Sequence, residues 1–168
     1  MKMTDLMSLE DWEKLEKELH ERFGLNAAAS DAEGVRLTKY ANWGNPLCPR
    51  IKGDPKGLSA ICAVAGRHFN TTCQSSRSPL VEECDAGLVK IAVPVIKDGE
   101  YLGCVGGCGL LFEDSEVETF LVSKSLEIEE SEAERLAADV TSISHDRADE
   151  IVLYLKDRLA QLGADAVN

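Results

Sequence analysis

Three cysteines stand in the stretch of this sequence whose residue types and spacing most suggest chemistry. In "EECDAGLVKIAVPVIKDGEYLGCVGGCGLL", residues 82–111, Cys84 precedes an apolar run, and Cys104 and Cys108 lie in a glycine-rich run. Alternate residues of a strand share a face, so we expect Cys104, Gly106 and Cys108 on one side of a sheet. The surrounding glycines leave room for a bound group to approach closely.

Such thiols can simply be small, buried hydrophobic residues, but they can also carry chemistry. Three or four converging thiolates could bind zinc or an iron–sulfur cluster, since both favour tetrahedral sulfur ligation. No C-x-x-C pair is present, so the spacing does not separate metal ligands from inert buried thiols or from the lining of a pocket. These alternatives stay open at the level of spacing.

A catalytic thiol is a third hypothesis, and it needs a base beside the sulfur. Of the three histidines only His68 lies in the region of the cysteines, and no Ser-His-Asp or paired-carboxylate arrangement is visible. The glycine-rich "GCVGGCG" lies within a predicted strand, with no lysine and no following helix, so it is not typical of a phosphate-binding loop. We therefore expect no enzyme.

The elements that position these residues begin with an amphipathic helix and a hairpin. The segment "SLEDWEKLEKELHERFG" opens at Ser8 and closes at Gly24. Its apolar stripe predicts packing on a core or on a dimer partner; it consists of Leu9, Trp12, Leu15, Leu19 and Phe23. "LNAAAS" and "VRLTKY" around the turn "DAEG" predict two paired strands, with Gly34 in the turn.

The remaining pattern predicts an α+β fold. An irregular segment, 41–55, precedes a helix over "KGLSAICAVAGRHFNTTC". "LVEEC" and "LVKIAVPVI" predict strands, and "KDGE" predicts a hairpin turn before the strand "YLGCVGGCGLLF". Three helical segments, each opened by Asp or Ser, follow within 114–163. We expect one domain over 1–168, with a core at about 5–112 and a C-terminal helical segment.

The composition limits the partners. The net charge of −12 argues against nucleic acid and against an anionic membrane surface, because both need clustered Lys and Arg. No run approaches the roughly 18 apolar residues of a membrane span, and no secretory signal is evident. We therefore expect a soluble, cytoplasmic protein with reduced thiols.

Two segments carry a resemblance to a known family. "NPLCPRIKGDPKGLSAIC" and "ECDAGLVKIAVPVIKDGEYLGCVGGCGLL" resemble the PocR sensory domain, which has three recurring cysteines, an "AGL" element and a "dGeylG" turn. The resemblance extends over nearly the whole chain. On these motifs the recurring cysteines are Cys48, Cys62 and Cys84, the glycine of "AGL" is Gly87, and the turn is Asp98–Gly99.

The chain departs from the family pattern at two positions and adds a thiol. Asp85 stands where the family has histidine, Cys108 replaces a glutamine, and Cys104 is additional. These departures would change the polarity of the family's pocket, so its ligand does not transfer to this chain. They also suggest a sulfur-rich metal site, holding an iron–sulfur cluster or zinc. The favoured ligands are Cys62, Cys84, Cys104 and Cys108, with Cys48 as substitute.

The resemblance implies a PAS-like antiparallel sheet with flanking helices and a sensory role. The family is proposed to sense simple hydrocarbon derivatives such as diols. We expect a small-molecule ligand in a pocket lined by Cys84, Asp85, Gly87, Cys104, Gly106 and Cys108. No DNA-binding or transmitter segment is recognisable in these 168 residues, so we expect output through an unidentified signalling partner or a homodimer.

Overall fold

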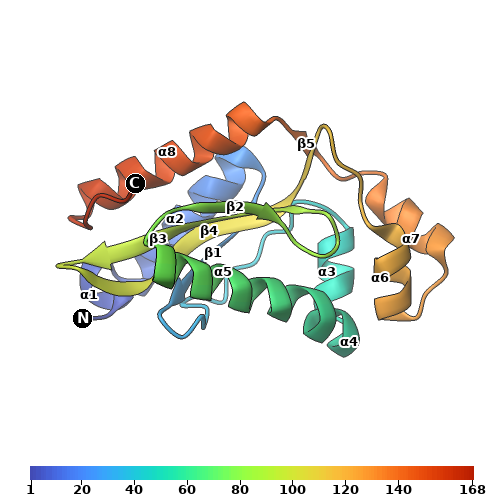
Figure 1. The fold of residues 1–168 in the computed structure, drawn as a ribbon, viewed down its shortest axis with the longest axis horizontal. Coiled ribbons are helices and arrows are strands. Elements are labelled where there is room, and N and C mark those ends of the chain that lie inside the picture. The colour runs from blue at the N-terminus through green and yellow to red at the C-terminus, as the bar shows by residue number, and fades with distance from the viewer.

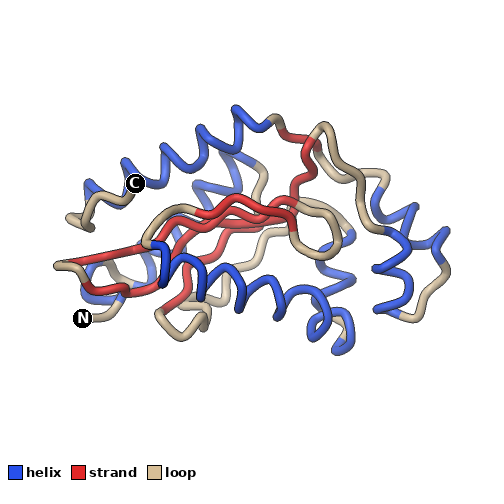
Figure 2. The backbone as a smooth tube through the Cα atoms, in the orientation of Figure 1, coloured by secondary structure: helices blue, strands red, loops and turns tan.

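The computed structural model describes residues 1–168 and centres on an antiparallel sheet with the strand order β1-β4-β3-β2. The strands are β1 (Asn26–Asp31), β2 (Leu80–Glu83), β3 (Val89–Lys97) and β4 (Glu100–Phe112). A fifth short strand, β5 (Ser142–Ile143), pairs in parallel with the end of β4. Figure 2 shows the strands as one central layer between helices. The predicted α+β class is confirmed.

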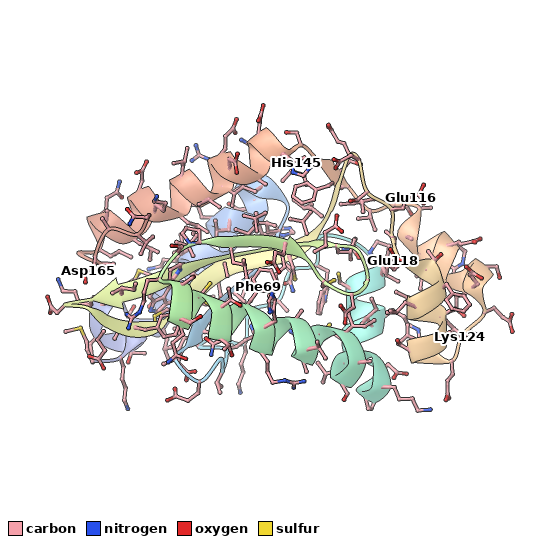
Figure 3. The ribbon with its side chains drawn as sticks, in the orientation of Figure 1. Phe69, Glu116, Glu118, Lys124, His145 and Asp165 are labelled. Atoms are coloured by element: carbon pink, nitrogen blue, oxygen red, sulfur yellow. The ribbon has the colours of Figure 1, made fainter.

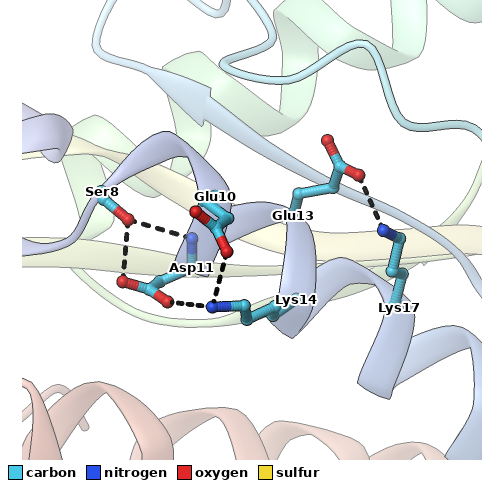
Figure 4. A network of polar contacts seen from close by, with 6 residues as sticks. All are labelled: Ser8, Glu10, Asp11, Glu13, Lys14 and Lys17. Atoms are coloured by element: carbon cyan, nitrogen blue, oxygen red, sulfur yellow. Dashed lines mark hydrogen bonds and ion pairs between the residues drawn. The ribbon is translucent and has the colours of Figure 1, made fainter.

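The first long helix begins and ends where its signals predicted. After a short α1 (Met3–Leu6), helix α2 (Leu9–Phe23) starts with the Ser8 side chain accepting the Asp11 N–H at 3.1 Å. Lys14 and Lys17 pair with acids one turn earlier along the exposed side (Figure 4). Gly24 ends the helix in the left-handed conformation.

The apolar stripe of α2 packs into the protein's own core. Trp12, Leu15 and Leu19 are fully buried there, and the Trp12 Nε1–H donates to the carbonyl of Met3. Leu9 lies outside this core and is 51% exposed. The stripe is therefore used by the fold, and it supplies no argument for a homodimer.

The first predicted hairpin is only half right. Strand β1 and the turn at Gly34 form as predicted, with φ of +81° at the glycine. The second strand does not form, and a single bridge joins Ser30 to Arg36. The Leu37 N–H still donates to the Ala29 carbonyl, but the Ala29 N–H donates at 2.8 Å to the buried Glu16 carboxylate and not to a partner strand.

A helical insert covers one face of the sheet. It runs through α3 (Leu47–Lys52), α4 (Pro55–Gly57), the π-helical turn η1 (Leu58–Cys62) and α5 (Ala63–Ser76). Figure 1 shows α5 along one side of the sheet and α8 (His145–Gln161) along the other. The predicted helix through Cys73 is confirmed, with a wider turn at its start.

The second hairpin places the glycine-rich strand in the middle of the sheet. Asp98 and Gly99 both have positive φ, as a tight two-residue hairpin turn requires. β4 returns beside β3 and also pairs with β1. It therefore has neighbours on both edges.

Two of the three C-terminal helices pack around a second, smaller core, and the third packs on the main core. Helices α6 (Thr119–Leu126) and α7 (Glu130–Ala137) lie beyond one end of the sheet (Figure 1). Val122 and Leu126 pack there with Ile61 of η1 and Leu47 and Ile51 of α3. None of the three helices is capped by its predicted Asp or Ser: Glu118 and Glu129 precede α6 and α7, and Ser144 caps α8, whose predicted first residue, Asp146, lies in the first turn.

Candidate functional site

A pocket of about 520 Å³ lies between the sheet and the η1–α5 segment. Alternate residues of three adjacent strands form its floor, in rows set by the strand register. One row is Asn26–Cys108–Lys90, and the next is Ala28–Gly106–Ala92. The predicted shared face of Cys104, Gly106 and Cys108 is therefore the pocket floor.

Small residues keep this space open. The middle row of the floor contains two alanines and a glycine, and a Cβ at Gly106 would lie 1.9 Å from the Ile91 carbonyl oxygen. On the opposite wall Gly66 of α5 also faces the pocket, and nothing lies within 4 Å of the position that its Cβ would occupy. Gly106 and Gly107 line the pocket, whereas Gly103 and Gly109 do not, and a Cβ at any of these four glycines would meet a neighbouring atom within 3.1 Å. The predicted open space above the glycines is therefore only partly correct.

The polar lining is predominantly basic. Arg36, Lys52, Arg67 and Lys90 line the pocket from four separate segments, and Glu33 is the single acidic residue among the lining side chains. None of these four cations forms an ion pair with a carboxylate within 4 Å. These four basic residues were missed in the sequence. For Arg67 a signal was available, because Ala63, Gly66, Arg67 and Asn70 recur at helical spacing and therefore share one face of the helix.

The structure separates the six cysteines into two groups. Burial and the nearby Cys108 thiol raise the pKa of Cys48 to about 12. Cys84 and Cys62 also raise it, which makes these four thiols electrostatic neighbours. Cys48, Cys62 and Cys84 pack against the second core.

The other two cysteines lie on the main core. Cys104 is 8% exposed, and its sulfur lies 3.3 Å from the Ser30 hydroxyl on β1. Cys73 of α5 is fully buried, and burial followed by Cys104 raises its pKa to about 12. Cys104 therefore belongs with Cys73. In the predicted ligand set Cys104 stood with Cys62, Cys84 and Cys108, but in the structure Cys48 is the fourth thiol of that group.

The predicted metal site has no support in the side-chain positions. No group of three or more His, Cys, Asp or Glu side chains is arranged so that it could hold a metal ion. All six cysteines are free thiols. The neighbouring thiols are thus near one another without forming a coordination shell.

The predicted site residues fall in two places. Cys62, Cys104, Gly106 and Cys108 line the pocket, whereas Cys48, Cys84, Asp85 and Gly87 do not. Asp85 is exposed in the loop that follows β2. Gly87 has a φ of +82° in that loop, and a Cβ there would lie 2.5 Å from the Glu116 carbonyl oxygen. Gly87 is needed for the loop to pack against the segment before α6.

No histidine is hydrogen-bonded to a cysteine. His68 Nε2 lies 2.7 Å from Glu82, and His20 Nδ1 lies 2.9 Å from the Leu25 carbonyl oxygen. His145 lies at the start of α8 (Figure 3). It contacts Asp114 and stacks on Phe112, with ring centroids 4.0 Å apart. The catalytic-thiol hypothesis thus gains no base from the structure.

The thiol pKa values predict slow chemistry at neutral pH. Burial, followed by Cys108, raises the pKa of Cys62 to about 11. We expect iodoacetamide at pH 8 to label Cys62 about 100-fold more slowly in the native protein than in urea, where a free thiol titrates near 8.5. Peptide mass mapping over time measures both rates. Rapid native labelling of Cys62 would instead support a catalytic or redox thiol.

The chain thus combines an α+β fold with a concave pocket of mixed polarity over its sheet. The chain matches the family described as the sensory domain found in PocR over residues 5–165. It therefore belongs to the family of PocR sensory domains. No curated protein and no solved structure matches it. No helix is both long and apolar enough to cross a membrane.

Proposed function

We propose that this sensory domain binds a small molecule in the pocket between the sheet and α5, and that occupancy is relayed to a signalling partner. The observation that carries the proposal is the pocket itself. Its volume of about 520 Å³ lies in the range of small-molecule sites, and residues from β1, β3, β4, η1 and α5 converge on it.

The π-helical turn η1 offers a route from the pocket to the C-terminal helices. Leu58 and Cys62 of η1 line the pocket, whereas Ile61 lies between them in the sequence and belongs to the second core, together with Val122 and Leu126 of α6. π-helical turns are frequent at functional sites. A ligand that prefers one arrangement of η1 would therefore also bias α6 and α7.

Filling the pocket from α5 tests the proposal. Gly66→Leu should raise the free energy of unfolding by roughly 0.5–1 kcal/mol, because leucine is the better helix former and its Cβ meets no atom. The same variant should lose ligand binding, because the side chain occupies the pocket. The measurement is a thermal-shift screen of small metabolites against both proteins, since a ligand stabilises only the native state that binds it.

The control must be a leucine substitution outside the pocket. Gly163→Leu is unsuitable, because Gly163 has a φ of +78° and any side chain there would strain the backbone. Val64→Leu, on the exposed side of the same helix, is a better one, since Val64 is 39% exposed and does not line the pocket. A ligand that stabilises wild type, Val64→Leu and Gly66→Leu equally would place binding elsewhere and contradict the proposal.

A second candidate function is metal binding by the four neighbouring thiols Cys48, Cys62, Cys84 and Cys108. The observation that favours it is that Cys108, Cys84 and Cys62 lie near enough to Cys48 to raise its pKa. Metal binding would require the side chains to move closer and to lose their protons. Anaerobic purification decides the question: visible absorption or about one zinc per chain supports this candidate. A colourless, metal-free, folded protein excludes it.

A further inference from the structure

We infer that the ligand of this pocket is a small anion that carries carboxylate or phosphate oxygens. The inference rests on the proposed function and narrows its ligand class. It starts from a contrast of charge: the chain carries a net charge of −12, yet the lining of its main pocket has four basic residues and one acidic residue.

The four cations reach the pocket from different parts of the chain. Arg36 follows β1, Lys52 ends α3, Arg67 lies on α5, and Lys90 is on β3. Arg36, Lys52 and Lys90 are half-buried, and Arg67 is exposed. Since none forms an ion pair, the positive charge of this group is not neutralised by the fold.

Lys52 is close enough to two other cations of this group to be opposed by their charges. Burial lowers the pKa of Lys52, and the charge of Arg36 lowers it further. Lys90 acts in the same direction. Like charges in a partly desolvated site repel, and a bound anion would relieve that repulsion.

Backbone oxygens and aromatic rings hold these cations in place. The Arg36 guanidinium donates to the carbonyls of Ala27 and Tyr40, while its Nε–H is buried without a partner. The Lys52 ammonium lies 5.9 Å from the centre of the Trp43 ring, and the Lys90 ammonium lies 5.4 Å from that of Phe69. These contacts orient the cations and leave their charge in place.

The nearest acids do not cancel this group. Glu33 is exposed at the pocket rim, where its backbone N–H donates to Asp31. The buried Glu16 carboxylate is occupied by the Ala29 N–H and the Thr38 hydroxyl, and burial raises its pKa. Arg36 opposes that rise but lies beyond ion-pair distance of Glu16.

A neutral donor completes the site. Asn26 lines the pocket and is 4% exposed. Its amide oxygen accepts the Asn42 N–H at 3.2 Å, and its NH₂ group has no hydrogen-bond partner in the protein. Asn26 and Lys90 lie in the same row of the pocket floor, with Cys108 between them. An unpaired amide donor in that row is suited to an oxyanion, which accepts several hydrogen bonds at once.

The test compares anions with a neutral diol on the full chain. Inorganic phosphate, pyrophosphate and citrate are titrated by calorimetry against wild type and Lys52→Gln/Lys90→Gln, with propane-1,2-diol as the neutral probe. We expect at least one anion to bind wild type, the double variant to weaken that binding by about tenfold or more, and added NaCl to weaken it further. Comparison of citrate with the phosphates separates the two oxyanion sources.

Lys124→Gln/Lys156→Gln is the charge-matched control, because neither lysine lines the pocket. Lys124 lies on α6, at the end of the molecule beyond the sheet (Figure 3). Equal anion binding by wild type and Lys52→Gln/Lys90→Gln, or no binding of any anion, would overturn the inference. If propane-1,2-diol then binds wild type but not Gly66→Leu, the pocket function survives without the anion. If a ligand binds wild type and Gly66→Leu equally, the pocket function fails as well.

Discussion

Gly106→Ala is expected to lower the free energy of unfolding by about 3 kcal/mol or more. Gly106 lies in the central strand β4, opposite Ala28 of β1 and Ala92 of β3. An added Cβ would lie 1.9 Å from the Ile91 carbonyl oxygen and 3.0 Å from the Ala92 Cα, and both are backbone atoms. The pairing of β3 with β4 must therefore shift to admit one methyl group.

The matched control is the same substitution on the opposite wall of the pocket. Gly66→Ala adds a methyl group in the interior of α5, where nothing lies within 4 Å. It should raise the free energy of unfolding by roughly 0.5–1 kcal/mol, because alanine is the better helix former. Urea denaturation of both variants measures the two effects. A Gly106→Ala protein as stable as wild type would contradict the tight contact between the strands.

Glu16→Ala is expected to lower the free energy of unfolding by about 2–3 kcal/mol. The Glu16 side chain is fully buried on α2, where its carboxylate accepts the Ala29 N–H of β1 at 2.8 Å and the Thr38 hydroxyl. Alanine would leave a backbone donor on β1 without its acceptor. Thr38 would lose the contact that holds the chain after the missing strand.

Glu16→Gln separates the hydrogen bonds from the charge. Burial raises the Glu16 pKa above its usual 4.5, so the native state favours the protonated carboxyl. The protonated carboxyl makes its full contribution to the free energy of unfolding below the pKa that Glu16 has in the unfolded chain. That contribution is lost as the pH rises through the raised pKa of the native state. Glutamine keeps an acceptor for Ala29 and does not titrate. The stability of wild type relative to Glu16→Gln should therefore fall as the pH rises above about 4.5, in urea unfolding at several pH values. A difference that does not change with pH would contradict the raised pKa.

Local signals predicted most of the elements because they act over a few residues. Ser8 and Gly24 delimit α2, and Asp98 with Gly99 form the turn between β3 and β4. The alternation along β4 placed Cys104, Gly106 and Cys108 on one face, and the pocket lies over that face. These features depend on backbone geometry and on the period of side-chain directions.

The missing strand after Gly34 shows where such signals fail. "VRLTKY" has the composition of a strand, but only Arg36 bridges to β1. Glu16 lies on the preceding helix α2, 13 residues before Ala29, and takes the Ala29 N–H. A segment can pair as a strand only if the N–H and C=O groups of the neighbouring strand are not already bonded to other partners. Those partners are known only from the fold.

The sequence alone determined the α+β class, the glycine-rich central hairpin and the family, because each depends on neighbouring residues or on motifs. The grouping of the thiols and the charge of the pocket are decided by the tertiary structure. Cys48 replaces Cys104 beside Cys62, Cys84 and Cys108 because α3 and the loop after β2 share the second core. The four basic residues span positions 36 to 90 and meet only because α3 and α5 fold over the sheet. A chain with a net charge of −12 thereby acquires a basic pocket.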